Sequence, residues 1–485
     1  MIQSAYDSVF GEDKEEVPNF LPPMLNIDLN KKIIDNAMMK AKKEGKWVLA
    51  FVIGTKPCFY KFYGSIIAAE KKGIPYIIID SKQHYDAILT YGLKEFNYSD
   101  KVAVELNIRG GLAQKSAELM LKVSWFAKYL LSHYPTVKVV PVVLGDTIMT
   151  SIVPPAWMFS REEKAIHNEA GLRSMTPLIM IKANEVGKSL SVESFIEQQF
   201  NGDWMLMRNE PFPEQWDTFV ASAGCDYLFT PTELNKQHLL REGYPEENIL
   251  VTGGVVVEAL EVKRNEKPKK SIFKIYPQLA KGEWLRVDIH RKENLTKHRF
   301  CAIMEGIKKL VDEGFNVLFV EMNATKHGLD QFGLRKDLDE LKRKKNFLCT
   351  PVWEEYANVI EFFESKHCWS VLTDSGGVQE EMNILKKPCL TCRLNTDRPE
   401  TVNVAKGNLL VPPVNADVIF KMVNYVFNNE QLRKSMSESP DLYGSKVADK
   451  MMNHINKLMK SGATTSQGCQ DRLRLWKDDS HTRFK

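Results

Sequence analysis

Short apolar runs alternate with amphipathic stretches along most of this chain. In the first half the runs predict strands over 46–53, 76–79, 137–144, 165–169, 226–230 and 249–252. In the second half they predict strands over 284–289, 317–321, 347–350, 369–373 and 388–391. Strands that alternate with helical segments are typical of βαβ units with a parallel sheet. The pattern therefore predicts an α/β protein with two Rossmann-like, doubly wound domains facing a central cleft.

A charged stretch, 261–270, lies where the alternation pauses and predicts a linker. The segment 175–209 has weak periodicity, so we expect it to be an insertion in the first domain, near the cleft. The expected parts are an N-terminal tail (1–27), an N-terminal domain (28–260), a C-terminal domain (261–445), a helix (446–460) and a second tail (461–485).

Composition and charge exclude several classes of protein. The 485 residues are 44% hydrophobic and 26% charged, which supports sizeable cores and excludes a disordered or collagen-like chain. A net charge of +4 is too slight to indicate a nucleic-acid partner. The acidic start is unlike a signal peptide, and no run of 18 apolar residues is present. We therefore expect a cytoplasmic protein without a membrane partner.

The cysteines are scattered, and Cys389 and Cys392 form their only close pair. A lone CxxC without a second pair or nearby histidines is poor evidence for zinc. This one falls in a predicted strand, where residues three apart face opposite sides. We expect reduced thiols and no bound metal.

An anion-binding turn is predicted where the strand 369–373 ends. Ser375, Gly376 and Gly377 follow that strand, and a helix is expected to begin at about Gly377. Two glycines remove the side chains that would keep a phosphate from the backbone, and free N–H groups at the helix start would face the anion. The alternative is a tight strand-to-helix turn that needs glycine only for its φ values.

Arg393 and Arg398 follow the next predicted strand. They could bind a diphosphate or anchor a carboxylate, or they could form surface pairs with glutamate. No GxGxxG motif follows a predicted strand, which counts against a nicotinamide or flavin dehydrogenase.

Ionisable side chains follow other predicted strands. Asp146 comes after the strand that ends at Leu144, and Glu169 lies in HNEAGLRS. Glu214 follows Phe212-Pro213, and His290 ends LRVDIH. Each alone is more often a cap or a surface group. Together, around one inferred phosphate site, they favour an active site.

Several motifs occur along the chain in a fixed order. They are GTKP (54–57) with Lys61, QH (83–84), GDT (145–147), HNEAGLRS (167–174), Pro213-Glu214, TPTELNKQHLLREG (230–243), VTGGVVVEAL (251–260), IHRKENL (289–295), DSGGVQEE (374–381) and RLNTDRPETVNVAKGNLLV (393–411). In this order they closely resemble the non-hydrolysing UDP-N-acetylglucosamine 2-epimerases. The resemblance covers roughly residues 45 to 445, apart from the insertion.

The resemblance implies a GT-B fold, with the nucleotide sugar held between two Rossmann-like domains. The implied activity is reversible inversion at C2 of UDP-GlcNAc to UDP-ManNAc, by elimination and re-addition of UDP, without a metal or a redox cofactor. The product would supply polysaccharide or glycan synthesis, and a homodimer is common in the family. The catalytic residues implied are Asp146, Glu169, Glu214 and His290.

The resemblance also implies positions that bind the substrate. They are Lys56, Lys61, Asn323, Ser375, Gly376, Gly377, Glu381, Arg393 and Arg398, and an allosteric site would use Gln83 and His84. Lys56 replaces a family arginine, so a point charge stands in place of a bidentate fork. Cys58 replaces an acidic residue, and Gln215 stands where the family has a second acidic residue beside Glu214. Tyr356 is a candidate for the aromatic contact to uracil.

Three other functions remain open at this point. One is a hydrolysing epimerase that releases ManNAc and UDP, although such enzymes generally carry serines in place of Asp374-Ser-Gly-Gly377. Another is a GT-B glycosyltransferase, for which the segment 175–209 could supply the acceptor site. The last is a nucleotide-sugar binding protein without catalytic activity.

Overall fold

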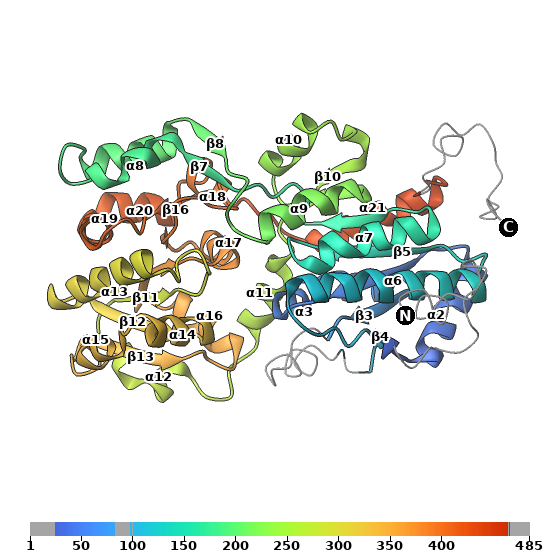
Figure 1. Ribbon diagram of the computed structural model, residues 1–485, viewed down its shortest axis with the longest axis horizontal. Coiled ribbons are helices and arrows are strands. Elements are labelled where there is room, and N and C mark those ends of the chain that lie inside the picture. The colour runs from blue at the N-terminus through green and yellow to red at the C-terminus, as the bar shows by residue number, and fades with distance from the viewer. Residues whose placement is uncertain (1–24, 83–97, 99, 464, 466–485) are drawn as a thin grey trace, which may run out of the picture. The chain divides into compact units, whose positions relative to one another are not determined.

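The computed structural model describes residues 25–82, 98, 100–463 and 465 (Figure 1). The described chain divides into two compact units. Unit 1 comprises the described residues of 1–172, 212–258 and 445–485, and unit 2 comprises 173–211 and 259–444. Each unit contains its own largely parallel sheet, which confirms the predicted α/β class.

Unit 1 is built on an eight-stranded sheet with the order β1-β4-β3-β2-β5-β6-β9-β10. Only β1 pairs in the antiparallel sense, with β4. The strands β2, β5, β6 and β9 are buried along their whole length, so their sequences read as apolar runs without alternation. The strands are β1 (Asp28–Leu29), β2 (Val48–Ile53), β3 (Tyr76–Asp80), β4 (Val102–Glu105), β5 (Val139–Leu144), β6 (Ala165–Asn168), β9 (Cys225–Thr230) and β10 (Ile249–Val251).

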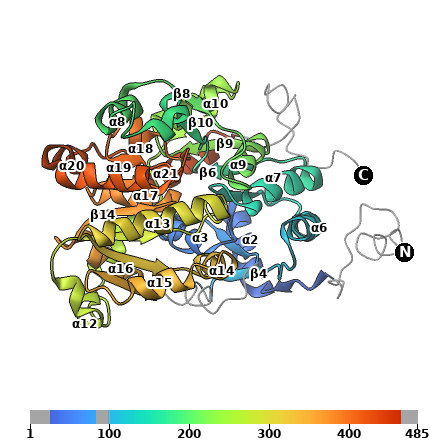
Figure 2. The same ribbon diagram turned by 60° about the vertical axis from the view of Figure 1, so that its left-hand side comes forward.

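Helices cover the sheet of unit 1. In Figures 1 and 2, α6, α7 and α9 lie side by side over the sheet, and α7 contacts both of its neighbours. The terminal helix α21 packs against α4. The helices are α2 (Lys31–Glu44), α3 (Lys56–Lys61), α4 (Tyr63–Lys71), α6 (Leu112–His133), α7 (Ile148–Arg161), α9 (Glu214–Ala223), α10 (Glu233–Arg241), η3 (Glu246–Asn248) and α21 (Val447–Lys460).

Unit 2 contains a six-stranded parallel sheet with the order β13-β12-β11-β14-β15-β16. The strand order reverses between β11 and β14. Their carboxyl ends therefore flank a topological switch point, where open α/β sheets bind ligands. The strands are β11 (Trp284–Asp288), β12 (Asn316–Glu321), β13 (Phe347–Pro351), β14 (Cys368–Thr373), β15 (Cys389–Thr391) and β16 (Asn408–Leu410).

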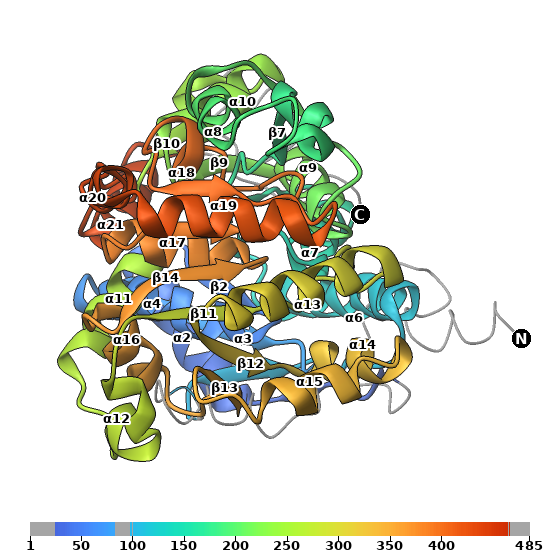
Figure 3. The same cartoon turned by 90° about the vertical axis from the view of Figure 1, so that its left-hand side faces the viewer.

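The helices of unit 2 complete its core. Helices α13 and α19 pack against each other beside the sheet (Figure 3). None of the helices that the structure describes is both long and apolar enough to cross a membrane. The helices are α12 (Ile272–Ile275), η4 (Pro277–Ala280), α13 (Lys297–Asp312), α14 (Asn323–Gln331), α15 (Arg335–Leu341), α16 (Tyr356–Glu364), α17 (Gly376–Ile384), α18 (Glu400–Asn403), α19 (Ala416–Asn428) and α20 (Glu430–Ser437).

The segment 175–209 is folded and groups with unit 2, whereas the sequence analysis assigned it to the first domain. Its Phe195 is fully buried in the apolar core of unit 2. Gln199 donates to the backbone oxygen of Leu410 at 2.9 Å and accepts from its N–H at 2.8 Å, which satisfies an edge of strand β16. The elements of the segment are β7 (Met175–Pro177), η2 (Leu178–Glu185), α8 (Val192–Asn201) and β8 (Trp204–Leu206).

Two other predicted boundaries differ from the structure. Helix α11 (Val256–Asn265) continues into the stretch 261–270 that was expected to be a linker, and the chain passes from unit 1 to unit 2 within this helix. The helix α21 groups with unit 1, because its apolar side chains pack there. Most of the predicted tails, 1–27 and 461–485, lies outside the described residues.

Candidate active site

Glu169 stands directly after β6 and is 2% exposed. Its backbone φ of 61° is left-handed, which is unusual for a residue with a side chain and tends to occur at functional sites. Lys61, at the end of α3, donates to its two carboxylate oxygens at 2.6 and 2.9 Å. Lys61 is itself only 7% exposed. This buried ion pair fixes the Glu169 carboxylate in one place.

The turns that follow β5 and β6 are held together. The ring nitrogen Nε2 of His167 lies 2.8 Å from the backbone oxygen of Gly145. A Cβ at Gly145, whose φ is +70°, would lie 3.2 Å from Oε2 of Glu169. Glycine is therefore required between β5 and Asp146, and the Glu169 carboxylate lies beside that turn.

Three more carboxyl groups gather at this edge of unit 1. Asp146 follows Gly145 directly before α7, and Glu214 and Asp217 lie one turn apart at the start of α9. Asp217 has no exposed surface, and its Oδ1 accepts a hydrogen bond of 2.5 Å from Ser151 of α7. Burial raises the pKa of Asp217 to about 7, and the charges of Asp146 and Glu214 raise it further against the opposing bond from Ser151. The three carboxyl groups therefore act on one another.

The sequence analysis missed Asp217. A single aspartate in an amphipathic helix usually faces solvent, and its burial here comes from the packing of α9 against α7. The only signal in the sequence was its spacing of three residues from Glu214.

In unit 2, His290 follows β11 and Asp374 follows β14, the two strands at the switch point. The fully buried Asp374 accepts the backbone N–H of His290 at 3.1 Å and that of Arg291 at 2.9 Å. It also accepts from the side-chain amide of Asn294 at 3.1 Å. The His290 Nδ1 lies 3.1 Å from Oδ1 of Asp374. Such a carboxylate contact orients an imidazole ring.

The Ser-Gly-Gly turn begins helix α17, as the sequence predicts. The N–H of Ser375 donates to the hydroxyl of Thr373 at 3.0 Å. A Cβ at Gly376 would lie 2.6 Å from Oδ2 of Asp397, whereas a Cβ at Gly377 would meet no atom within 4 Å. Gly376 is thus required by packing, and Gly377 borders open space. The first N–H groups of a helix lack intrahelical acceptors and attract an anion.

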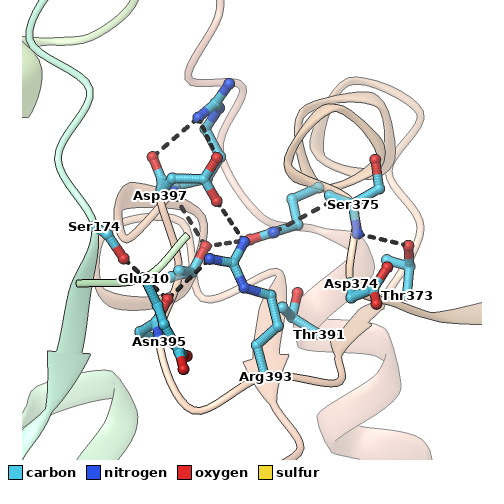
Figure 4. Close-up of polar contacts among 12 residues, drawn as sticks. Ser174, Glu210, Thr373, Asp374, Ser375, Thr391, Arg393, Asn395 and Asp397 are labelled. Atoms are coloured by element: carbon cyan, nitrogen blue, oxygen red, sulfur yellow. Dashed lines mark hydrogen bonds and ion pairs between the residues drawn. The ribbon is translucent and has the colours of Figure 1, made fainter. Parts of the chain in front are cut away.

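Arginines surround the Asp397 carboxylate (Figure 4). Arg393 donates to its Oδ1 at 2.6 Å, and Arg398 donates to its Oδ2 at 3.0 Å. Burial opposes the ionisation of Asp397, but the guanidinium groups of Arg393, Arg398 and Arg291 outweigh it and hold the pKa of this carboxyl well below its usual range. Arg398 also pairs with Glu380 at 2.5 Å. Both predicted arginines are therefore buried partners of carboxylates beside the glycine turn.

The segment 175–209 is joined to this network by its flanking residues (Figure 4). The Ser174 hydroxyl donates to Oδ1 of Asn395 at 2.9 Å, and the Asn395 amide donates to Glu210 at 3.1 Å. Arg393 also donates to Oδ1 of Asn395, at 2.8 Å. The start and the end of the segment are thus fixed close to Arg393.

Glu381 lies on α17 and is 5% exposed. Burial raises the pKa of Glu381 to about 7, against the opposing effects of the Tyr356 hydroxyl, which donates to it at 2.7 Å, and of Arg286. Arg286, on β11, lies over the rings of Trp353 and Phe363, with centroid distances of 5.2 and 4.9 Å. The sequence analysis missed Arg286, because one arginine within an apolar strand gives no functional signal.

The remaining predicted residues are less tightly held. Asn323 is exposed at the start of α14, which is joined to the end of β11 by a 2.5 Å hydrogen bond from Thr325 to the backbone oxygen of Ile289. Lys56 begins α3, but its side chain lies outside the part that the structure describes. Gln83 and His84, the expected allosteric residues, also lie outside the described residues.

The predicted side chains thus form one set in each unit. Among the described residues, no group of three or more His, Cys, Asp or Glu side chains is placed to hold a metal ion. In unit 1 the set comprises Lys61, Asp146, Glu169 and Glu214. In unit 2 it comprises His290, Asn323, Ser375, Gly376, Gly377, Glu381, Arg393 and Arg398.

Comparisons with known proteins point to one family. The family model for UDP-N-acetylglucosamine 2-epimerase matches residues 207–456. A UDP-N-acetylglucosamine 2-epimerase of Methanocaldococcus jannaschii is 30% identical over 393 residues, which are 79% of this chain and 93% of that protein. One of Methanococcus maripaludis is 26% identical over 372 residues, covering 75% of this chain and 87% of that one.

A solved structure agrees with these matches. The crystal structure of the M. jannaschii UDP-GlcNAc 2-epimerase in complex with UDP-GlcNAc and UDP has a TM-score of 0.66 and 27% sequence identity to this chain. The similarity covers 84% of this chain and 99% of that one. The two-unit α/β architecture is therefore that of a GT-B fold, as the sequence predicts.

Proposed function

Because this chain belongs to the UDP-N-acetylglucosamine 2-epimerase family, we propose that it interconverts UDP-GlcNAc and UDP-ManNAc without releasing free sugar. The carboxyl groups of unit 1 are the observation that supports this most directly. Inversion at C2 needs groups that remove a proton from one face of the sugar and return one to the other. Asp146, Glu169 and Glu214 provide such groups on adjacent turns.

The proposed reaction begins with the loss of UDP. The C2 proton of the sugar is not next to a carbonyl, so its direct removal would leave an unstabilised carbanion. Once UDP has left, C1 resembles an oxocarbenium ion and the C2 proton becomes acidic. Its loss gives a glycal, and return of the proton on the other face with re-addition of UDP gives the epimer. Each positioned proton transfer contributes about 10²–10⁴-fold.

Unit 2 is proposed to hold the UDP. The N–H groups at the start of α17 would bind the diphosphate beside Gly377, where a Cβ meets no atom within 4 Å. The buried Glu381 carboxylate would accept hydrogen bonds from the ribose hydroxyls. His290, oriented by Asp374, would stabilise the charge of the departing diphosphate.

Unit 1 is proposed to act on the sugar. Negative carboxylates stabilise a cationic C1 electrostatically, most strongly where water is excluded. Glu169 is fixed for this role by Lys61, and Asp146 and Glu214 are the groups that we propose to carry the proton. No metal and no redox cofactor enters this scheme.

The test is incubation with UDP-GlcNAc alone, followed by proton NMR of the products. The proposal predicts an equilibrium mixture of UDP-GlcNAc and UDP-ManNAc. Release of free ManNAc and UDP would identify a hydrolysing epimerase and contradict the non-hydrolysing assignment. Unchanged UDP-GlcNAc would favour a glycosyltransferase or a binding protein, and would contradict the proposal altogether.

A further inference from the structure

Asp217 has an environment that a structural carboxylate does not need. It has no exposed surface, and its only hydrogen-bond donor in the structure is the Ser151 hydroxyl, on Oδ1. Its Oδ2 is buried without a hydrogen-bond partner. A carboxyl that served only to join α9 to α7 would be stabilised by a cation or by further donors, because an uncompensated buried charge is costly.

The charged groups that act on Asp217 are the proposed catalytic ones. Glu214 lies three residues before it on α9, and Asp146 precedes α7; both act on it as negative charges. From the elements packed against α9, α7 presents Ser151 and carries Arg161 at its far end. Of the titratable groups on the adjoining strands, His167 contacts Ser222, one turn further along α9.

Strand β9, which also packs against α9, has one carboxylate. Asp226 lies at the start of β9, next to the end of α9, and its carboxylate is 3.9 Å from the Lys164 ammonium. It is thus separated from Asp217 by the length of the helix. In the described part of the molecule, the fields of Asp146 and Glu214 therefore dominate at Asp217.

Resting on the proposed function, we propose that Asp217 is a positioning residue for the epimerase reaction. Through Ser151 it holds α9, and with it Glu214, against the helix that follows Asp146. When it loses its proton it adds a third negative charge, which makes Asp146 and Glu214 stronger bases and favours a cationic sugar. The protonation state of Asp217 thus sets how strongly the other two carboxylates act.

This proposal predicts a step in the pH profile of the wild-type enzyme. Asp217 gives up its proton near pH 7, so kcat for UDP-GlcNAc should rise as the pH passes through that value. Asp217→Asn keeps the shape of the side chain and an acceptor for Ser151, but it never ionises. We expect this variant to lack the step near pH 7 and to have a kcat about tenfold lower at pH 8, with KM changed less than twofold.

Ser151→Ala is the second variant. The Ser151 hydrogen bond lowers the pKa of Asp217, so its removal should move the step to higher pH and leave the kcat at pH 9 close to that of the wild type. Asp226→Asn, a buried carboxyl at the other end of α9, is the control and should keep the wild-type profile.

The experiment measures kcat and KM for all four proteins from pH 5 to 9. An Asp217→Asn profile with the wild-type shape would overturn the proposal, and so would a loss of activity that is the same at every pH. If the wild-type protein does not epimerise UDP-GlcNAc, the proposed function fails and this inference falls with it. If it does, an unchanged step in Asp217→Asn removes only the role of Asp217.

Discussion

Lys61 and Glu169 show how one side chain can fix another at the scale of single residues. Two buried charges lie 2.6 Å apart, and removal of one leaves the other without compensation. We expect Lys61→Met to lower the free energy of unfolding of unit 1 by about 3–5 kcal/mol in urea denaturation. The double variant Lys61→Met/Glu169→Gln should lose less than the two single variants together, because neither charge remains.

An exposed ion pair of the same unit provides the control. Lys101 and Glu70 lie 2.7 Å apart, with side chains 27% and 37% exposed. Lys101→Met should change the free energy of unfolding by about 1 kcal/mol or less. Equal losses for Lys61→Met and Lys101→Met would contradict the account of the buried pair.

Glu400 makes a prediction about stability and pH. It is 1% exposed and accepts a 2.9 Å hydrogen bond from the Tyr443 hydroxyl. Burial raises the pKa of the Glu400 carboxyl from 4.5 to about 7, although Arg398 and the Tyr443 bond oppose the rise. The folded state therefore keeps a proton that the unfolded state loses, so this group's contribution to stability is full below pH 4.5 and is lost as the pH rises to about 7.

Glu400→Gln removes this dependence. Relative to the wild type, its free energy of unfolding should increase by about 3 kcal/mol between pH 4.5 and 7 and then level off. The measurement is urea denaturation at several pH values, with Glu430→Gln, an exposed carboxyl on α20, as the control. A constant difference between Glu400→Gln and the wild type across this range would show that Glu400 titrates normally.

At the scale of elements, the start of α17 separates packing from ligand binding at two adjacent glycines. A Cβ at Gly376 would lie 2.6 Å from the Asp397 carboxylate, and one at Gly377 would stand in open space. Gly376→Ala should therefore lower both the unfolding temperature and the affinity for UDP. Gly377→Ala should leave the unfolding temperature unchanged and weaken UDP binding about tenfold or more, because its methyl group occupies the proposed phosphate position.

Calorimetric titration with UDP and thermal unfolding of both variants test this prediction. The two glycines act as controls for each other, since the substitution and the helix are the same. Normal UDP affinity in Gly377→Ala would place the diphosphate somewhere other than the start of α17.

The strands could be predicted where burial on both faces gives a continuous apolar run, as in β2, β5 and β14. The strand β16 could not, because it has only three residues and begins with Asn408. Asn408 is buried because its amide donates to Gln379 of α17 at 3.0 Å, a partner 29 residues away. Short strands that are completed by distant side chains leave no periodic signal in the sequence.

The candidate site could be predicted in the same measure. Ser375 to Gly377, Asp146 and Glu169 directly follow strands, so the rule that ligands bind at the carboxyl ends of parallel strands finds them. Asp217 and Arg286 lie inside a helix and a strand, and only the packing of neighbouring elements makes them buried charged groups. Arg393 and Arg398 were found, but their commitment to Asp397 and Glu380 depends on contacts that the sequence does not encode locally.

At the scale of the whole molecule, the account assigns one task to each unit. Unit 2 carries the glycine turn with its arginine and carboxylate network, and unit 1 carries the carboxyl groups with the Lys61–Glu169 pair. The segment 173–211 leaves unit 1 and returns to it, so the chain connects the two tasks more than once. Neither set alone explains inversion at C2: the first would bind UDP, and the second would move protons.

Reaction with UDP-GlcNAc in deuterated water tests the central claim most directly, because it follows the C2 proton itself. The account predicts that deuterium appears at C2 of UDP-ManNAc and also at C2 of the recovered UDP-GlcNAc, and at no other carbon of the sugar. Mass spectrometry and proton NMR of the separated UDP-sugars measure both. UDP-ManNAc that still carries protium at C2, or UDP-GlcNAc that remains unlabelled and unconverted, would contradict it.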